Sequence, residues 1–221
     1  MTGGRADMMA RIRASLGRGA LAQADREACD RRLADPPTHP APAWVEGAPQ
    51  ELRAGFIDRI TEQEATADTV AGWTDVPAAV ARYLAGHNAP ARARIAPAEA
   101  LRALDWGGLE VAYGPAAETD AVGIGLGLAG VAETGTLVVA SGPDSPATLN
   151  FVPETHIVLL PADRIVGPFE AVWRRLREMA PTPPRVINLI SGPSRTADIE
   201  QTMILGAHGP KRLHVIVIDR P

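Results

Sequence analysis

The residues best suited to bind a small anion lie in the segment 191–196. Gly192 would let the backbone approach a ligand, and the forked guanidinium of Arg195 suits a carboxylate or a phosphate. The apolar spacing from residue 197 to residue 204 predicts a helix, whose first free N–H groups would face the same anion. The alternative is ordinary helix capping by Ser194 or Thr196, and the spacing alone favours it.

Glu133 is a second candidate, because it precedes the apolar run 137–140. A carboxylate at the mouth of a buried strand would be partly desolvated, so it could act as a general base, a nucleophile or a ligand to a polar substrate. It could equally accept hydrogen bonds from nearby backbone N–H groups and brace the turn. The residues leave these alternatives open.

The histidines differ in their surroundings. His208 lies in a loop flanked by glycines and is expected to be exposed, which makes it a candidate for proton transfer. His156 begins an apolar strand and His214 alternates with apolar neighbours, so both are expected to be core residues. Their spacing matches no metal site, and we predict no metal.

Two further patterns concern glycine. The glycines at 123, 125, 127 and 130 do not form a dinucleotide-binding fingerprint, so they indicate bulges or close backbone approach in a strand. Ser141–Pro143 repeats the Ser-Gly-Pro of Ser191–Pro193 after a comparable apolar run, and the two loops could face one cleft.

Composition excludes several classes of protein. The chain has 221 residues, 46% of them hydrophobic, and a formal net charge of -4, which gives no basic field for nucleic acid. Cys29 is the only cysteine, so this chain can form neither an internal disulfide nor an iron–sulfur cluster, which needs about four thiolates. No stretch has the length of a membrane span or the pattern of a signal peptide. We therefore expect a soluble, cytoplasmic protein.

Helical and strand patterns alternate from about residue 51. Such alternation predicts an α/β fold with helices covering a largely parallel sheet, and ligands in these folds tend to lie beyond the carboxyl ends of the strands. Residues 1–47 are predicted to form an N-terminal helical segment and a Pro-rich linker, and residues 48–221 the α/β domain. Within residues 1–47, helices are expected around Met8–Leu16 and Leu21–Leu33.

Four motifs, in matching order, resemble the lactate utilization protein C family, which bears the LUD domain. They are Ala132–Leu137, Pro153–Val158, Ser191–Glu200 and His208–Pro210. The resemblance implies an α/β domain similar to the ribose-phosphate isomerase and CoA-transferase-like (NagB/RpiA-like) superfamily. It also implies a role in oxidising L-lactate to pyruvate together with iron–sulfur partner proteins, with no cofactor in this chain.

The motif positions supply the candidate site residues. We assign Glu133 and His208 to proton transfer. We assign substrate binding to Thr134, Thr136, Ser191, Ser194, Arg195, Thr196 and Asp198. The ligand expected is a small carboxylate or phosphate.

Two other functions stay open. One is a free-standing enzyme that acts on a sugar phosphate or an acyl-CoA, with Glu133 as base or nucleophile. The other is a structural module whose loops only cap helices. Whether the chain catalyses any reaction alone is not decided by the sequence.

Overall fold

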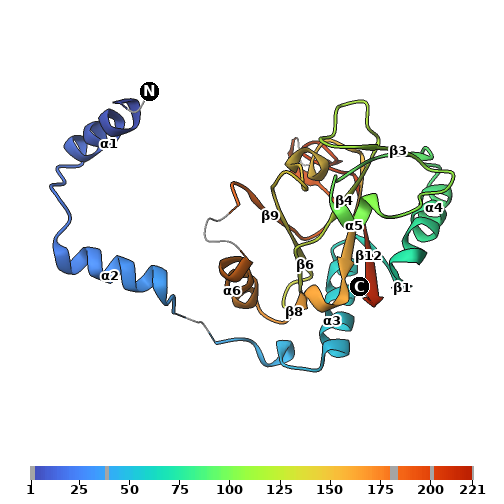
Figure 1. Ribbon diagram of the computed structural model, residues 1–221, viewed down its shortest axis with the longest axis horizontal. Helices are drawn as coiled ribbons and strands as arrows, with labels where there is room; N and C mark the ends of the chain where they lie inside the picture. The colour runs from blue at the N-terminus through green and yellow to red at the C-terminus, as the bar shows by residue number, and fades with distance from the viewer. Residues whose placement is uncertain (1–2, 38–39, 180–183, 200–201, 221) are drawn as a thin grey trace. The chain divides into compact units, whose positions relative to one another are not determined.

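The computed structural model describes residues 3–37, 40–179, 184–199 and 202–220 (Figure 1). The chain divides into two compact units, residues 1–40 and residues 41–221. The second unit reaches back beyond residue 48, because Val45 is buried and its backbone packs against Gly167.

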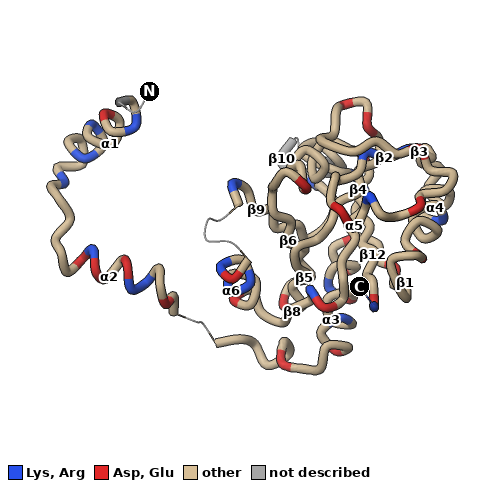
Figure 2. Tube along the Cα trace, in the orientation of Figure 1, with Lys and Arg blue, Asp and Glu red and all other residues tan. Residues whose placement is uncertain are grey.

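The first unit contains the two predicted helices, α1 (Gly3–Ser15) and α2 (Gln23–Ala34). Residues 4–34 are all exposed, and charged residues recur along α2 (Figure 2). Among the described residues, no helix has the length and apolar character needed to cross a membrane.

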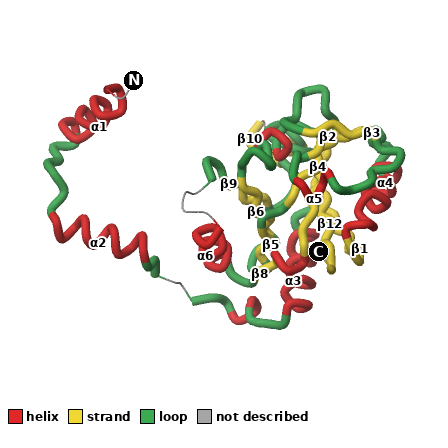
Figure 3. The backbone as a smooth tube through the Cα atoms, viewed as in Figure 1, coloured by secondary structure: helices red, strands yellow, loops and turns green. Residues whose placement is uncertain are grey.

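A six-stranded parallel sheet forms the centre of the second unit (Figure 3). Its strands, in spatial order, are β1 (Thr66–Gly72), β12 (Arg212–Arg220), β7 (Thr155–Pro161), β4 (Val122–Leu126), β2 (Arg92–Ile95) and β3 (Glu110–Tyr113). The α/β fold class and the parallel sheet predicted from the alternating pattern are confirmed.

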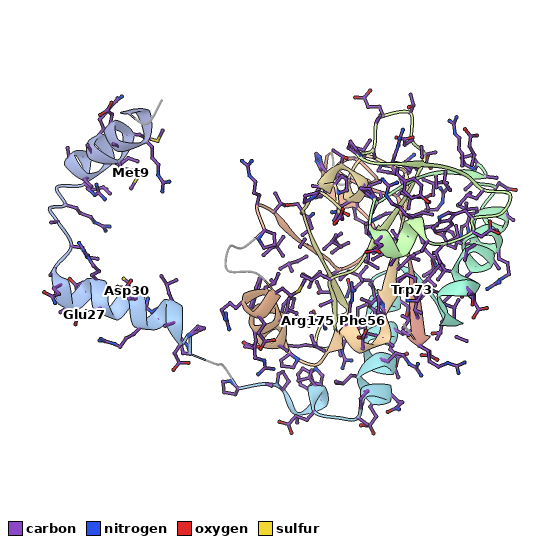
Figure 4. All side chains as sticks on the ribbon, viewed as in Figure 1. Met9, Glu27, Asp30, Phe56, Trp73 and Arg175 are labelled. Carbon is purple, nitrogen blue, oxygen red and sulfur yellow. The ribbon has the colours of Figure 1, made fainter. Side chains whose placement is uncertain are left out.

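Helices cover both faces of this sheet, as the alternation of buried side chains requires. On one face, Ile157 and Leu159 of β7 belong to a core with α4 (Val76–Gly86) and α5 (Glu99–Arg102). On the other face, Val158 and Leu160 pack with α3 (Pro49–Glu62), whose fully buried Phe56 is labelled in Figure 4. Short 3₁₀ turns are η1 (Ala43–Val45), η2 (Trp73–Asp75), η3 (Ala147–Asn150) and η4 (Ala162–Arg164).

A second sheet has four strands, in the order β8 (Ile165–Val166), β5 (Ala129–Val131), β6 (Thr136–Ala140) and β9 (Ile187–Ile190). The β5–β6 and β6–β9 pairs are antiparallel. Helix α6 (Phe169–Met179) packs against this sheet, and Val172 and Leu176 join Val138 in its core (Figure 3).

The glycines of β4 permit close approach by neighbouring side chains, as one of the two interpretations of this run predicted. A Cβ atom at Gly123 would lie 2.7 Å from Cγ of Pro153, and one at Gly125 would lie 3.3 Å from Nε2 of His156. Since alternate residues face the same side of a strand, this bare face of β4 accommodates the His156 ring and the η3 connection.

The helix predicted after Thr196 is wrong. Residues Arg195–Ile199 form strand β10, which pairs with β11 (Thr202–Leu205) in an antiparallel hairpin. The β-branched residues at 196, 199, 202 and 204 favour extended structure, and here they outweigh the helical spacing of the apolar positions. The anion site predicted in the segment 191–196 therefore has no helix N-terminus to supply free N–H groups.

Candidate functional site

A cavity of about 210 Å³ lies at the amino ends of β7 and β12, rather than at the carboxyl ends where ligands were expected. Its walls come from the end of η3, from the loop after β9 and from the loop before β12. Two backbone hydrogen bonds join these loops: Ser194 N–H donates to Pro210 O over 2.8 Å, and Gly206 N–H donates to Ser194 O over 2.9 Å. The cavity is thus bounded by backbone that is fixed on two sides.

His156 lines this cavity from the second position of β7. Its side chain is 1% exposed, and neither ring nitrogen has a hydrogen-bond partner among the described residues. Burial lowers the pKa of His156 to about 4, so the ring is neutral at pH 7. A neutral imidazole has one N–H donor and one acceptor lone pair, and no described residue hydrogen-bonds to either.

Asn150, the last residue of η3, lines the same cavity. It is 3% exposed, and its Nδ2 is buried without a hydrogen-bond partner among the described residues. Buried polar groups are nearly always paired, so two such residues on one cavity require an explanation. Sequence reasoning missed both. The available signal was a histidine at the start of a strand within the motif Pro153–Val158.

Three predicted site residues also line the cavity, Ser191, Ser194 and His208. His208 is exposed, as expected for a loop histidine, and it also lines an adjoining groove of about 490 Å³. That groove contains Asp120 and Lys211, and the Lys211 ammonium lies 3.7 Å from the carboxylate of Glu154. His208 therefore lies between the cavity that contains His156 and the groove that contains Asp120 and Lys211.

Hydroxyl groups connect the two predicted motifs. Thr134 Oγ1 lies 2.7 Å from Thr136 Oγ1, which lies 2.7 Å from Ser191 Oγ. Thr136 is buried at the start of β6, opposite the end of β9, and Ser191 belongs to the cavity wall. These three predicted binding residues thus hold the loop after β9 against β6.

Glu133 has the bracing role that was one of its two interpretations. Its Oε2 accepts a hydrogen bond of 3.2 Å from Phe169 N–H, the first residue of α6. Its own N–H donates to Gly167 O over 3.1 Å. Glu133 does not line the cavity beside His156. A carboxylate at a helix N-terminus satisfies a free N–H group and complements the helix dipole.

Replacing Glu133 with alanine is expected to lower the free energy of unfolding by about 1 kcal/mol, because the first turn of α6 loses its acceptor. Glu133→Gln should retain most of that stability, since its side-chain oxygen can still accept the bond. Urea unfolding of both variants checks this, with exposed Glu178→Ala in α6 as control. Wild-type stability in Glu133→Ala would contradict the capping role.

Arg195 does not contact the cavity. Its guanidinium pairs with the carboxylate of Glu64 and lies 3.4 Å from Gln63 O, so it joins β10 to the chain that follows α3. Thr196 and Asp198 belong to β10, and their side chains lie outside the described residues. The predicted anion role of this segment therefore finds no support in the contacts of Arg195.

The two Ser-Gly-Pro loops do not face one cleft. Strands β6 and β9 are antiparallel, so Ser141 follows the end of β6 beside the start of β9, while Ser191 follows the end of β9. Ser141 Oγ accepts a 3.0 Å hydrogen bond from Val186 N–H at that opposite end. The repeated motif instead closes two ends of the same strand pair.

His214 is the other fully enclosed histidine, and it lies on the opposite face of the six-stranded sheet from His156. Its Nδ1 lies 2.8 Å from Thr66 Oγ1, and its ring stacks on Tyr83 with centroids 3.9 Å apart. Burial lowers the pKa of His214 to about 4, while nearby Asp68 acts to raise it. Its contacts match the expected structural role.

Comparison with known proteins agrees with the motifs. Residues 115–218 match the LUD domain family. This part of the chain, nearly half of its length, is similar to the LUD domain. All residues that line the cavity fall within the LUD domain, so the cavity is a feature of that domain rather than of the N-terminal unit.

Proteins similar to the LUD domain include two named lactate utilization protein C. That of Anoxybacillus flavithermus is 37% identical over 41% of this chain and 40% of its own length. That of Geobacillus thermodenitrificans is 36% identical over 48% of this chain and 45% of its own length. An uncharacterized protein of Neisseria meningitidis serogroup B is 39% identical over 40% of this chain and 38% of its own length. The matches thus span less than half of each curated relative.

The fold has a solved counterpart. The crystal structure of a DUF162 family protein from Deinococcus radiodurans superposes with a TM-score of 0.58. The two sequences are 25% identical, and the match covers 79% of this chain and 100% of that one. The α/β arrangement around the LUD domain is therefore shared with an experimentally determined structure.

Proposed function

We propose that this chain is the cluster-free subunit of a cytoplasmic system that oxidises L-lactate to pyruvate, working with iron–sulfur partner proteins. The names of the relatives from Anoxybacillus and Geobacillus support a role in lactate utilization. The single cysteine supports a subunit without clusters, because an iron–sulfur cluster requires about four thiolates. The clusters would then be held by the partners.

The observation that carries this proposal is the cavity between the loops that contain Ser194 and His208. Both loops belong to motifs that resemble the lactate utilization protein C family, and backbone hydrogen bonds join them. A cavity of about 210 Å³ suits a small organic acid. Ser194 and exposed His208 would contact the carboxylate, and the motif threonines would hold the wall in place.

The alternative of a free-standing enzyme acting on a sugar phosphate or an acyl-CoA has less support. It rested on likeness to the isomerase and CoA-transferase-like superfamily and on Glu133 as base or nucleophile. Glu133 instead caps α6, and no lysine or arginine is among the described residues that line the cavity. A phosphate group would lack the cationic partner that it usually has.

Deleting the gene for this chain tests the proposal. We expect the deletion strain to lose growth on L-lactate as sole carbon source, to grow normally on pyruvate, and to recover on lactate when the wild-type gene is restored. The pyruvate culture is the control for a general growth defect. Normal growth of the deletion strain on lactate would reject the proposed role.

A further inference from the structure

We infer that Asn150 and His156 form a binding site for the second oxygen of a small 2-hydroxy or 2-oxo carboxylate. The site is the inner end of the cavity, and it rests on the proposed function only for the choice of acid. The buried, unpaired side chains themselves are properties of the fold.

The two polar side chains of this site are buried and lack partners. Nδ2 of Asn150 and both ring nitrogens of His156 have no hydrogen-bond partner among the described residues, although both side chains are almost fully enclosed. A buried polar group without a partner destabilises the fold, so such groups persist where a ligand completes them. His214 differs in part: its Nε2 is also buried without a partner, but its Nδ1 has a protein partner in Thr66, whereas both ring nitrogens of His156 lack one.

The fold makes room for the ring of His156. Gly125 of β4 has no side chain, which leaves room for the His156 ring. A Cβ atom at this position would lie only 3.3 Å from Nε2 of His156. Phe151, beside Asn150, also lines the cavity and is half-exposed, so the entrance has an aromatic edge. The ring is therefore seated in a gap between a strand and a loop, beside the cavity that His156 helps to line.

The polar groups around the cavity limit which ligand fits. Neutral His156 can accept a hydrogen bond from a hydroxyl or donate one to a carbonyl, and the Asn150 amide can donate to either oxygen. No described residue lining the cavity carries a fixed positive charge, which disfavours a multiply charged phosphate more than a singly charged carboxylate. Ser194 and His208 remain for one carboxylate at the rim. These groups match an acid with an oxygen on the carbon next to the carboxylate.

Thermal unfolding of the purified full chain with L-lactate, pyruvate and propionate tests this inference. Propionate is the matched control ligand, because it has the same carbon skeleton and charge but lacks the second oxygen. We expect lactate or pyruvate, in excess, to raise the melting temperature, and propionate at equal concentration to raise it much less.

The decisive variant is His156→Leu, which removes the ring nitrogens and keeps an apolar side chain of similar size. Without ligand, its melting temperature should rise by roughly 2–6 °C, because an unpaired polar group leaves the core. With lactate or pyruvate, the shift seen in the wild type should disappear. A histidine that only supported the fold would give the opposite sign, a fall in melting temperature.

Two further variants keep the test sharp. Asn150→Ala removes the amide donor and should weaken the binding of lactate or pyruvate at least tenfold. This variant tests the site independently if His156→Leu does not fold. His214→Phe is the matched control: it should lower the melting temperature, since the Thr66 contact is lost, and retain the ligand shift.

The site inference is overturned if neither lactate nor pyruvate shifts the wild type, or if Asn150→Ala and a folded His156→Leu respond as the wild type does. Failure of the proposed function looks different. If the ligand shifts depend on Asn150 or His156 but the deletion strain grows normally on lactate, the site stands and the physiological role falls. If growth is lost but no acid binds, the role stands and the site falls.

Discussion

Lowering the pH from 7 to 4.5 is expected to destabilise the α/β unit by roughly 2–3 kcal/mol for each of its two enclosed histidines. The pKa of both His156 and His214 is about 4 in the folded chain, and an unfolded histidine has a value near 6.5. Between these values the unfolded state binds more protons. The stabilisation is therefore complete above pH 6.5 and is lost as the pH falls towards 4.

Urea unfolding at several pH values between 7 and 4.5 measures this loss. His156→Leu and His214→Phe should each remove about half of the pH dependence that the two histidines give to the free energy of unfolding. Asp120 adds to the acid sensitivity. Hydrogen bonds from Ala117 N–H and Arg94, and the positive charge of Arg94, lower its pKa despite partial burial. An unchanged slope in both histidine variants would show that neither ring is held neutral by the fold.

Replacing Gly135 with valine is expected to lower the free energy of unfolding by about 4 kcal/mol or more. Gly135 has a φ of 65°, in the left-handed region that a β-branched residue rarely adopts. A Cβ atom there would also lie 2.5 Å from Ile60 N and 2.6 Å from Arg59 C. Since both are backbone atoms of α3, the helix that carries buried Phe56 would have to move.

Gly142→Val is the matched control for this change. Gly142 also lies in a loop next to the second sheet, but it has no heavy atom within 4 Å of an added Cβ and no positive φ. Its replacement should change the free energy of unfolding by less than about 0.5 kcal/mol. Equal losses in the two variants would show that the contact between Gly135 and α3 is not the cause.

Much of the fold could be predicted from periodicity. The helices α1 and α2 lie close to the ranges expected around Met8–Leu16 and Leu21–Leu33, and the alternation of helical and strand patterns from about residue 51 predicted the parallel sheet and its covering helices. The hairpin at β10 and β11 could not be predicted in the same way. Its apolar residues fit a helical period, and pairing between two short strands is a tertiary preference.

The candidate site was harder to predict than the fold. Ser194 and His208 do line one cavity, but Glu133 and Arg195 engage α6 and Glu64 instead. The sequence shows which side chains can bind a ligand or transfer a proton, but not which hydrogen-bond or ion-pair partners they meet in the fold. The unpaired state of His156 is visible only in three dimensions, because it depends on which hydrogen bonds are not made.

Growth on L-lactate of a deletion strain that expresses His156→Leu tests the central claim most directly. His214→Phe, expressed at the same level, is the control for buried histidines in general. We predict that His156→Leu fails to restore growth although the protein is folded and at least as stable as the wild type, whereas His214→Phe restores it. Full growth with His156→Leu would contradict the claim that this cavity serves lactate utilization.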